Sequence, residues 1–459
     1  MTSLRSVFRP LGFALVAFCL QSFRPSALAA GAPAVPAAVE PPPVPDVLDL
    51  PTAVKYALEH NYSILEARER IRQQEGLIVE IRAQALPNAT LNSGYNRNEP
   101  SVSGGVPPAN GNWIIALNVR QTLYSGGSIP AAIDAARLAR AAALLDLRTS
   151  INNALLDTRT KFYNVLFTRE QIRVQEENLR LLTEQLQNVT DRFQAGTVSN
   201  FEVLTAKVQL ANAQPPLITA RNAFRLAIDQ LRQALGYSNT TPENLKKIPT
   251  FAGSLEVTPV TYDLTQALEA ARVQRPELQR LTVAEEADQA NVTIAQAGGR
   301  PTVALVGSYQ YLQNLVVDRP NQTMDGWTVG LQGSWAIFDG RATQGRITQA
   351  KSLLEQARLT RLDQTLSIEV QVRAAFSTLQ QAGELVDAAR QVVAQAEEAQ
   401  RLAQARFAAG TATQLDQLTA DVALTQARNN ELSADYNYNV ALATLRTALG
   451  EADAYAPTG

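Results

Sequence analysis

Two stretches of this chain closely resemble each other: RFQAGTVSNFEVLTAKVQL at Arg192–Leu210 and RFAAGTATQLDQLTADVAL at Arg406–Leu424. Ten of their nineteen positions are identical. In each stretch the apolar helical pattern runs up to a phenylalanine, and a glycine, Gly196 or Gly410, follows three residues later. Glycine is the residue best suited to the left-handed conformation that ends many helices. Each stretch therefore predicts the end of a helix.

A new helix is expected to begin shortly after each glycine. Ser199 stands three residues before Glu202, and Thr413 stands three residues before Asp416. This is the spacing of a capping box, in which a hydroxyl side chain and an acid each accept a hydrogen bond from the other residue's backbone N–H. Each stretch is therefore predicted to form a tight turn between two helices, and the chain makes this helical hairpin twice.

The repetition covers nearly the whole chain. Phe407 follows Phe193 by 214 positions, and the same offset relates many other identical residues without a gap. They include Asp49 and Asp263, Pro87 and Pro301, Tyr95 and Tyr309, Trp113 and Trp327, Gly126 and Gly340, and Gly236 and Gly450. A whole unit has therefore been duplicated. We expect two repeats of one architecture at 48–236 and 263–450, with tip turns at 195–199 and 409–413 and an irregular linker at 237–262 packed against the helices.

The composition argues against several classes of protein. The formal net charge is −2 and the basic residues are spread along the chain, whereas a nucleic-acid surface needs a clustered basic footprint. The chain has one cysteine, Cys19, and one histidine, His60, which follows a helical pattern and is interpreted as a helix-end residue. Disulfides and Cys- or His-based metal sites are therefore not expected. We expect no enzyme, no cofactor and no nucleic-acid partner.

The first residues predict export. Residues 1–29 combine an arginine-containing start, a short apolar core and an A-x-A cleavage site, as a secretory signal peptide does. Cys19 lies inside the apolar core and would be removed with it. A flexible Pro/Ala-rich segment at 30–47 follows, and a short tail at 451–459 ends the chain. No later stretch is apolar for long enough to form a transmembrane helix, so any membrane-embedded part would consist of strands.

Two segments have the alternating pattern of strand hairpins, at 88–124 and 301–338. Their strands are about ten residues long and mostly carry one apolar and one polar face, which suits tilted strands of an outer-membrane barrel. Half-buried hairpins of a soluble protein are the alternative. Aromatic residues near the strand ends are expected at the membrane interface: Tyr95, Trp113, Tyr309, Trp327 and Trp335.

Long helices follow both hairpins, at 130–194 and 343–408. Each would measure roughly 95 Å, and the apolar residues of the first have heptad spacing, which favours coiled-coil packing. A helix returns from each tip turn, and Pro215–Pro216 should break or kink the first of these. An earlier helix is expected from about Pro51 to Ala85. The fold class is therefore mainly α with β.

Four strands cannot close a barrel, and an open edge in lipid leaves backbone groups without hydrogen bonds. If the strands lie in a membrane, the chain must therefore form an oligomer. Long helices attached to these strands would extend well away from the membrane on one side. Together these features predict a shared duct across the outer membrane and the periplasm.

The order of elements resembles the TolC-like outer-membrane efflux protein family over nearly the whole mature chain. The two tip stretches carry the resemblance, together with the Asp-Leu pairs at 49–50 and 263–264 that open the repeats. The family implies a homotrimer in outer-membrane lipid, with a twelve-stranded β-barrel continuous with a twelve-helix α-barrel. It also implies a passive duct for efflux or type I secretion, which works with a periplasmic adaptor and an inner-membrane transporter.

The resemblance also assigns roles to residues of the tips. Gly196, Thr197, Gly410 and Thr411 match the turns that adaptors contact. The acidic positions just inside the entrance are matched by Glu202 and Asp416, which would form a cation-attracting constriction. Both acids could instead only cap their helices. The family often has a Tyr, an Arg and a second Asp around the second turn. Here these places hold Phe407, Ala412 and Thr419, so a polar latch is in doubt.

Two other classes remain open. A periplasmic coiled-coil adaptor would have one helical hairpin flanked by compact β modules, and the duplicated hairpins and strand pairs count against it. A soluble scaffold or enzyme would leave the aromatic-edged strands and the duplication unexplained. Within the favoured class, drug export and protein secretion both remain open.

Overall fold

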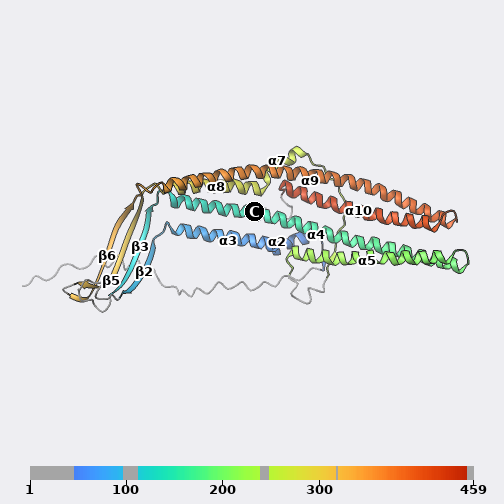
Figure 1. Cartoon of the computed structure of the whole chain (residues 1–459), viewed down its shortest axis with the longest axis horizontal. Coiled ribbons are helices and arrows are strands. Elements are labelled where there is room, and N and C mark those ends of the chain that lie inside the picture. The colour runs from blue at the N-terminus through green and yellow to red at the C-terminus, as the bar shows by residue number, and fades with distance from the viewer. Residues whose placement is uncertain (1–45, 97–111, 238–247, 317–318, 452–459) are drawn as a thin grey trace, which may run out of the picture. The chain divides into compact units, whose positions relative to one another are not determined.

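The computed structural model describes residues 46–96, 112–237, 248–316 and 319–451. The predicted signal peptide, most of the Pro/Ala-rich segment, part of the linker and nearly all of the C-terminal tail lie outside these residues. Within the described residues, helices and strands follow one another twice in the same order (Figure 1).

The first half comprises α2 (Leu50–His60), α3 (Tyr62–Ala83), β2 (Asn88–Asn96), β3 (Asn112–Tyr124), α4 (Ser128–Gln194) and α5 (Asn200–Leu235). The second comprises α7 (Leu264–Gln274), α8 (Pro276–Ala297), β5 (Thr302–Val316), β6 (Arg319–Ser334), α9 (Ala342–Ala408) and α10 (Gln414–Leu449). Corresponding helices have equal lengths, since α4 and α9 each have 67 residues and α5 and α10 each have 36.

The helices pack side by side as two hairpins, α4 with α5 and α9 with α10 (Figure 1). The hairpins contact each other because α10 also packs against α4. Nearer the sheet, α8 takes the corresponding place and packs against both α4 and α9, while α3 packs against α4. Each level of the chain thus presents four helices, two of which are the continuous α4 and α9.

The predicted break at Pro215–Pro216 is wrong, because α5 continues through both prolines as one helix. A proline inside a helix removes one hydrogen bond and crowds the preceding turn. Here Ala213 and Leu217, on either side of the pair, are buried. We attribute the continuity of the helix to this packing, which outweighs the local cost of the two prolines.

The single helix predicted from Pro51 to Ala85 is divided in the structure, because Asn61 leaves the helical conformation between α2 and α3. The Asn61 side chain accepts a hydrogen bond from Ser63 N at 2.9 Å and donates one from Nδ2 to Ala234 O at 2.7 Å. The Asn61 side chain thus caps α3 and supplies a hydrogen-bond donor to a backbone carbonyl at the C-terminal end of α5. His60 is the last residue of α2, as predicted.

Arg275 occupies the place of Asn61 in the second half, between α7 and α8. Its guanidinium donates to Thr447 O near the end of α10 at 3.1 Å and to Gln371 Oε1 of α9 at 3.0 Å. Arg275 Nε also lies 3.2 Å from Glu277 Oε2. The arginine is only 8% exposed, so its charge is balanced by a nearby carboxylate and by hydrogen-bond acceptors. The same joint is thus built twice with different chemistry.

The described part of the linker lies against the helices, as expected, but it is not wholly irregular. Thr250–Phe251 forms a short strand, β4, which pairs in parallel with β1 (Val47–Leu48). Phe251 packs in one apolar core with residues of α2, α4 and α5, and Val257 packs in another with α7, α9 and α10. Residue 47, predicted to be flexible, is therefore held in a strand.

The strands form one antiparallel sheet in the order β2-β3-β5-β6. Leu91 lies opposite Leu117, Leu117 opposite Tyr309, and Tyr309 opposite Trp327. These four side chains form an apolar row on one face, since residues directly opposite one another share a face. The neighbouring row on the other face is polar and consists of Thr90, Asn118, Ser308 and Thr328.

The second strand hairpin ends earlier than predicted, because β6 stops at Ser334 and both Trp335 and Ile337 lie beyond it. Ser334 pairs with Thr302, the first residue of β5. Pro301 comes before it and has no N–H to extend the ladder. The chain then turns toward α9.

Candidate functional site

The two helical tips have the same backbone geometry. Gly196 and Gly410 both have φ 74°, the left-handed conformation that the sequence predicted. Thr197 N donates to Arg192 O and Thr411 N donates to Arg406 O, each at 2.9 Å. Each glycine N–H also bonds to the phenylalanine carbonyl three residues earlier. This is the Schellman pattern, which ends the first helix and turns the chain within a few residues.

The predicted capping boxes are present at both tips. Asp416 Oδ2 accepts from both Thr413 N and Thr413 Oγ1 at 2.8 Å, and these hydrogen bonds hold the pKa of Asp416 below its usual value. The first copy is looser, with Ser199 N 3.4 Å from Glu202 Oε1. Both acids therefore cap helices, and Asp416 stays ionised at neutral pH. Its carboxylate is exposed and can act on a passing ion as well.

A hollow of about 550 Å³ lies between the tips of the two hairpins. Glu202 lines it from α5, and Thr413 and Gln414 line it from the start of α10. Asp416 is not part of its lining. Of the two predicted acids only Glu202 lines the hollow, together with Thr413, the N-cap residue of α10. Most of the other lining residues are apolar: Phe201, Phe407, Ala412, Leu415 and Leu418.

One contact at the tips was missed by the sequence analysis. The Arg192 guanidinium lies over the ring of Phe407, with its Cζ 4.6 Å from the ring centroid. This cation–π contact joins the end of α4 to the end of α9. The signal was present in the sequence, because an Arg-Phe pair stands at the same place in both tip stretches. What the sequence did not give is which arginine meets which ring.

A buried acid near the second tip was also missed. Asp421 is 5% exposed, and its Oδ1 accepts from Gln400 Nε2 at 2.7 Å. Burial raises the pKa of this carboxyl. The hydrogen bond joins α10 to α9 one to two turns above Asp416, so Asp421 serves the packing of the hairpin.

Some of the aromatic residues predicted near the strand ends lie elsewhere in the structure. Tyr95 and Trp113 lie opposite each other near the loop end of β2 and β3, as predicted. Tyr309 and Trp327 lie in the middle of β5 and β6, because these strands extend farther toward their loop than the alternation indicated. Trp335 lies at the helix end of the sheet, where its Nε1 donates to Gly299 O at 3.1 Å.

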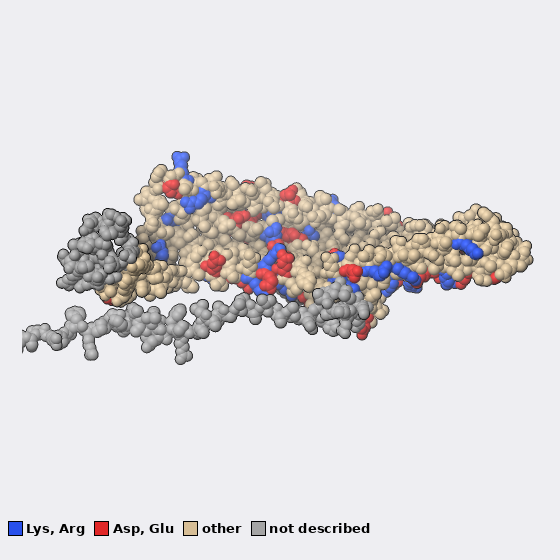
Figure 2. Space-filling model, turned by 60° about the horizontal axis from the view of Figure 1, so that its bottom comes forward, with Lys and Arg blue, Asp and Glu red and all other residues tan. Residues whose placement is uncertain are grey.

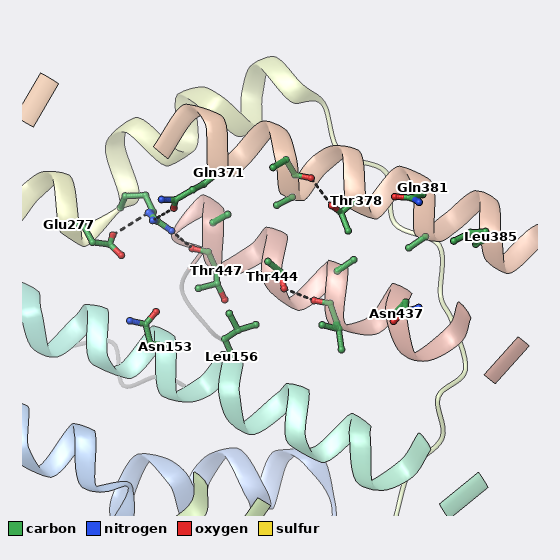
Figure 3. Close-up of a pocket in the computed structure, with 17 residues that line it drawn as sticks. Asn153, Leu156, Glu277, Gln371, Thr378, Gln381, Leu385, Asn437, Thr444 and Thr447 are labelled. Carbon is green, nitrogen blue, oxygen red and sulfur yellow. Dashed lines mark hydrogen bonds and ion pairs between the residues drawn. The ribbon is translucent and has the colours of Figure 1, made fainter. Parts of the chain in front are cut away.

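A second cavity, of about 650 Å³, lies where α8 begins and α10 ends against α4 and α9 (Figure 3). Its lining is mostly polar or small, with Asn153 from α4, Gln371 and Gln381 from α9, and Asn437 from α10. Glu277 lies at one end of the lining residues (Figure 3), where it forms its ion pair with Arg275. These groups can form hydrogen bonds with a solute, and the ion pair there is the structural joint described above.

The described residues on the face drawn in Figure 2 form no large site of one charge. On the face drawn in Figure 2, acidic and basic side chains are mixed along the helices. No group of His, Cys, Asp and Glu in the described part of the chain is arranged to hold a metal ion. Among the described helices, none combines the length and apolar character needed to cross a membrane.

Comparison with known proteins assigns the family. The model of the outer membrane efflux protein family matches residues 53–237 and again residues 267–451. The chain is 26% identical to protein CyaE of Bordetella pertussis over 330 residues, which cover 70% of this chain and 68% of CyaE. It is 25% identical to outer membrane protein TolC of Escherichia coli over 395 residues, 81% of this chain and 76% of TolC.

The fold agrees with this relationship. The outer membrane protein VceC of Vibrio cholerae superimposes with a TM-score of 0.72 at 20% identity, over 87% of this chain and 96% of VceC. The resemblance noted in the sequence is confirmed, and the alternatives of an adaptor, a scaffold or an enzyme are set aside. The protein acts in the outer membrane and extends into the periplasm. The chain belongs to the outer membrane efflux protein family, and it is a channel rather than an enzyme.

Proposed function

We propose that three copies of this chain form a passive duct across the outer membrane, through which an inner-membrane transporter exports its substrates. The observation that carries this proposal is the four-stranded sheet, which has an apolar face, a polar face and two outer strands, β2 and β6. Four strands from each of three copies make a barrel of twelve strands. Its apolar face meets lipid and its polar face meets water.

The apolar face supports this reading because it is exposed in the single chain. Leu91 is 70% exposed, Trp327 is 76% exposed and Leu331 is 71% exposed. Contiguous apolar surface of this kind marks contact with lipid or with another protein. The two outer strands support it further, because an unpaired strand edge is costly in lipid and closure removes it. Tyr95, Trp113 and Trp335 would then lie near the two membrane interfaces.

The helices extend the duct into the periplasm. Each 67-residue helix is about 100 Å long, and four helices at each level in each of three copies give a tube of twelve. The tip turns then lie farthest from the outer membrane. We propose that Gly196, Thr197, Gly410 and Thr411 contact a periplasmic adaptor there. The duct conducts passively, and the transporter supplies the energy for efflux or for type I secretion.

The mass of the assembly tests the first step. Native mass spectrometry of the detergent-purified mature chain is expected to give three copies. A single copy, with the sheet still folded, would contradict the barrel, because its edges would then have no partner.

We further propose that Asp416, with Glu202, lines the constriction at the tips. Asp416→Asn should weaken the block of single-channel current by a trivalent cation about ten-fold. The variant removes three carboxylates. With salt screening each contributes about 0.5 kcal/mol to the binding of a trivalent ion, or about 1.5 kcal/mol together, and about 1.4 kcal/mol corresponds to ten-fold. Because hydrogen bonds lower the pKa of Asp416, the block should persist in the parent protein at pH values below the ordinary carboxyl pKa.

Glu184→Gln is the matched control, since it removes an exposed acid of α4 above the tip turn. It should leave the block unchanged. If Asp416→Asn also leaves the block unchanged while the helix content is preserved, Asp416 is only a helix cap.

A further inference from the structure

We propose that a second copy docks on this chain as the chain's own two hairpins dock on each other, with Arg406 of one copy over Phe193 of the next. This inference rests on the proposed trimer and adds the residues that join its copies at the tips. It uses two facts, the contacts seen between the hairpins and the offset of 214 positions between the repeats.

Three contacts between the hairpins are seen within the chain. The Arg192 guanidinium lies over the Phe407 ring at 4.6 Å. Farther from the tip turns, Thr425 Oγ1 of α10 lies 3.4 Å from Asn178 Oδ1 of α4. The rings of Phe167 and Tyr436 stack with centroids 5.1 Å apart. All six residues are half-buried.

Each residue of these contacts has a counterpart 214 positions away in the other repeat. The counterpart of Arg192 is Arg406, and the counterpart of Phe407 is Phe193. The corresponding cation–π contact would therefore join the end of α9 to the end of α4. Within one chain this end of α4 is already engaged through Arg192. The remaining counterparts are Val392 with Ala211 and Gln381 with Asn222, which join α9 to α5.

Exposure separates the two sets of residues. All six counterparts are exposed: Arg406, Phe193, Val392, Ala211, Gln381 and Asn222. Phe193 is 43% exposed and Val392 is 49% exposed, so a second copy that covered both side chains would remove apolar surface from water. The seen contacts are thus covered by the neighbouring hairpin, while the same positions one repeat away are uncovered. A second copy that presents its α4–α5 hairpin to α9 would cover them.

The chemistry of the counterparts fits a contact between copies. The cation–π pair is retained without change of residue type. The polar pair of Asn178 and Thr425 is replaced by Val392 and Ala211, which gain from leaving water. The contact is head-to-tail, so it closes into a ring when the rotation between hairpins is repeated around an axis. In a ring of three copies, each of the six hairpins would then contact one hairpin of its own chain and one hairpin of a neighbouring chain.

Arg406 has a competing interaction in the single chain, because its charge helps to lower the pKa of Asp416. When a second copy docks, the Arg406 guanidinium therefore moves from Asp416 toward the Phe193 ring of the next copy, or lies between the two. This makes the pair a sensitive test of the geometry, since Arg406 would remain beside Asp416 if no second copy arrived.

Cross-linking of two singly substituted chains tests the inference. The only cysteine, Cys19, lies in the predicted signal peptide, so the mature protein offers a background without cysteine. A chain with Phe193→Cys and a chain with Arg406→Cys are co-expressed, and the purified assembly is treated with a bismaleimide about as long as an extended arginine side chain. A covalent dimer is expected on a denaturing gel, and neither chain expressed alone should give it.

The matched control uses the contact seen within the chain. Arg192→Cys and Phe407→Cys on separate co-expressed chains should give no dimer, whereas both substitutions on one chain should react without a change of oligomeric mass. A second pair, Val392→Cys and Ala211→Cys on separate chains, should again give a dimer and guards against a local defect at the tips.

The outcomes separate this inference from the proposed trimer. If native mass gives three copies but neither test pair yields a dimer, the inference is overturned and the trimer stands. If Arg192→Cys and Phe407→Cys give the dimer instead, the contact seen within the chain belongs between chains, and the inference is again overturned. If the unsubstituted protein is a single copy, both proposals fail.

Discussion

Leu117→Arg is expected to prevent stable insertion of the protein into the outer membrane. Leu117 lies in the middle of β3, a central strand, and in the apolar row with Leu91, Tyr309 and Trp327. An arginine facing lipid near the bilayer midplane costs about 2–4 kcal/mol in a barrel, and the proposed trimer would carry the change three times. The amount of folded trimer in isolated outer membranes measures the effect.

Asn118→Arg is the matched control. Asn118 is the next residue of the same strand and belongs to the polar row of the opposite face. An arginine there would face water inside the duct, so trimer should accumulate at close to the parent level while conductance changes. Equal loss of trimer in both variants would mean that the two faces do not meet different solvents.

Gly236→Ala should destabilise the protein more than other substitutions of a turn glycine. Gly236 has φ 76° at the end of α5, where it lies against the break between α2 and α3. A Cβ atom there would overlap the His60 carbonyl oxygen and lie 2.9 Å from the carbonyl carbon. The left-handed conformation alone costs alanine about 1 kcal/mol, and the overlap with backbone should bring the total to about 3 kcal/mol or more.

Gly196→Ala separates the two causes. Gly196 has nearly the same φ, 74°, but no atom lies within 4 Å of a Cβ built on it. It should lose only the conformational part, about 1 kcal/mol. The midpoint of thermal unfolding of the detergent-purified proteins, followed by circular dichroism, should therefore fall far more for Gly236→Ala. A similar fall in both variants would show that the packing against His60 contributes little.

The features that sequence alone predicted are those with a local cause or a repeated one. The tip turns follow from Gly196 and Gly410, whose neighbours also supply the helix cap. The equal lengths of α4 and α9 follow from the offset between the repeats. In these places the local preference of the backbone and the tertiary structure agree, which is the condition under which a sequence pattern predicts well.

The features that were missed depend on distant residues. The helix break at Asn61 requires the carbonyl of Ala234, 173 positions away, as an acceptor. The continuity of α5 through Pro215–Pro216 depends on burial of that helix against α4. β6 ends at Ser334 because the residue beyond its partner Thr302 is Pro301, which has no N–H to extend the ladder. In each case a distant part of the chain outweighed the local pattern.

The candidate site divides in the same way. Both capping boxes were predicted, because cap spacing is local. The contact between Arg192 and Phe407 was not, because two identical Arg-Phe pairs leave open which arginine meets which ring. The proposed constriction at Asp416 depends on the positions of three chains and needs a measurement on the assembly.

Single-channel recording in a planar bilayer tests the central claim that this chain forms a water-filled duct. The detergent-purified mature protein is added to one side, after its mass has been measured. The account predicts discrete, small, cation-preferring openings from a three-copy assembly, and their current should fall when a trivalent cation is added on the side of the helical tips. A protein that stays in solution as a single copy and never produces openings would contradict the duct.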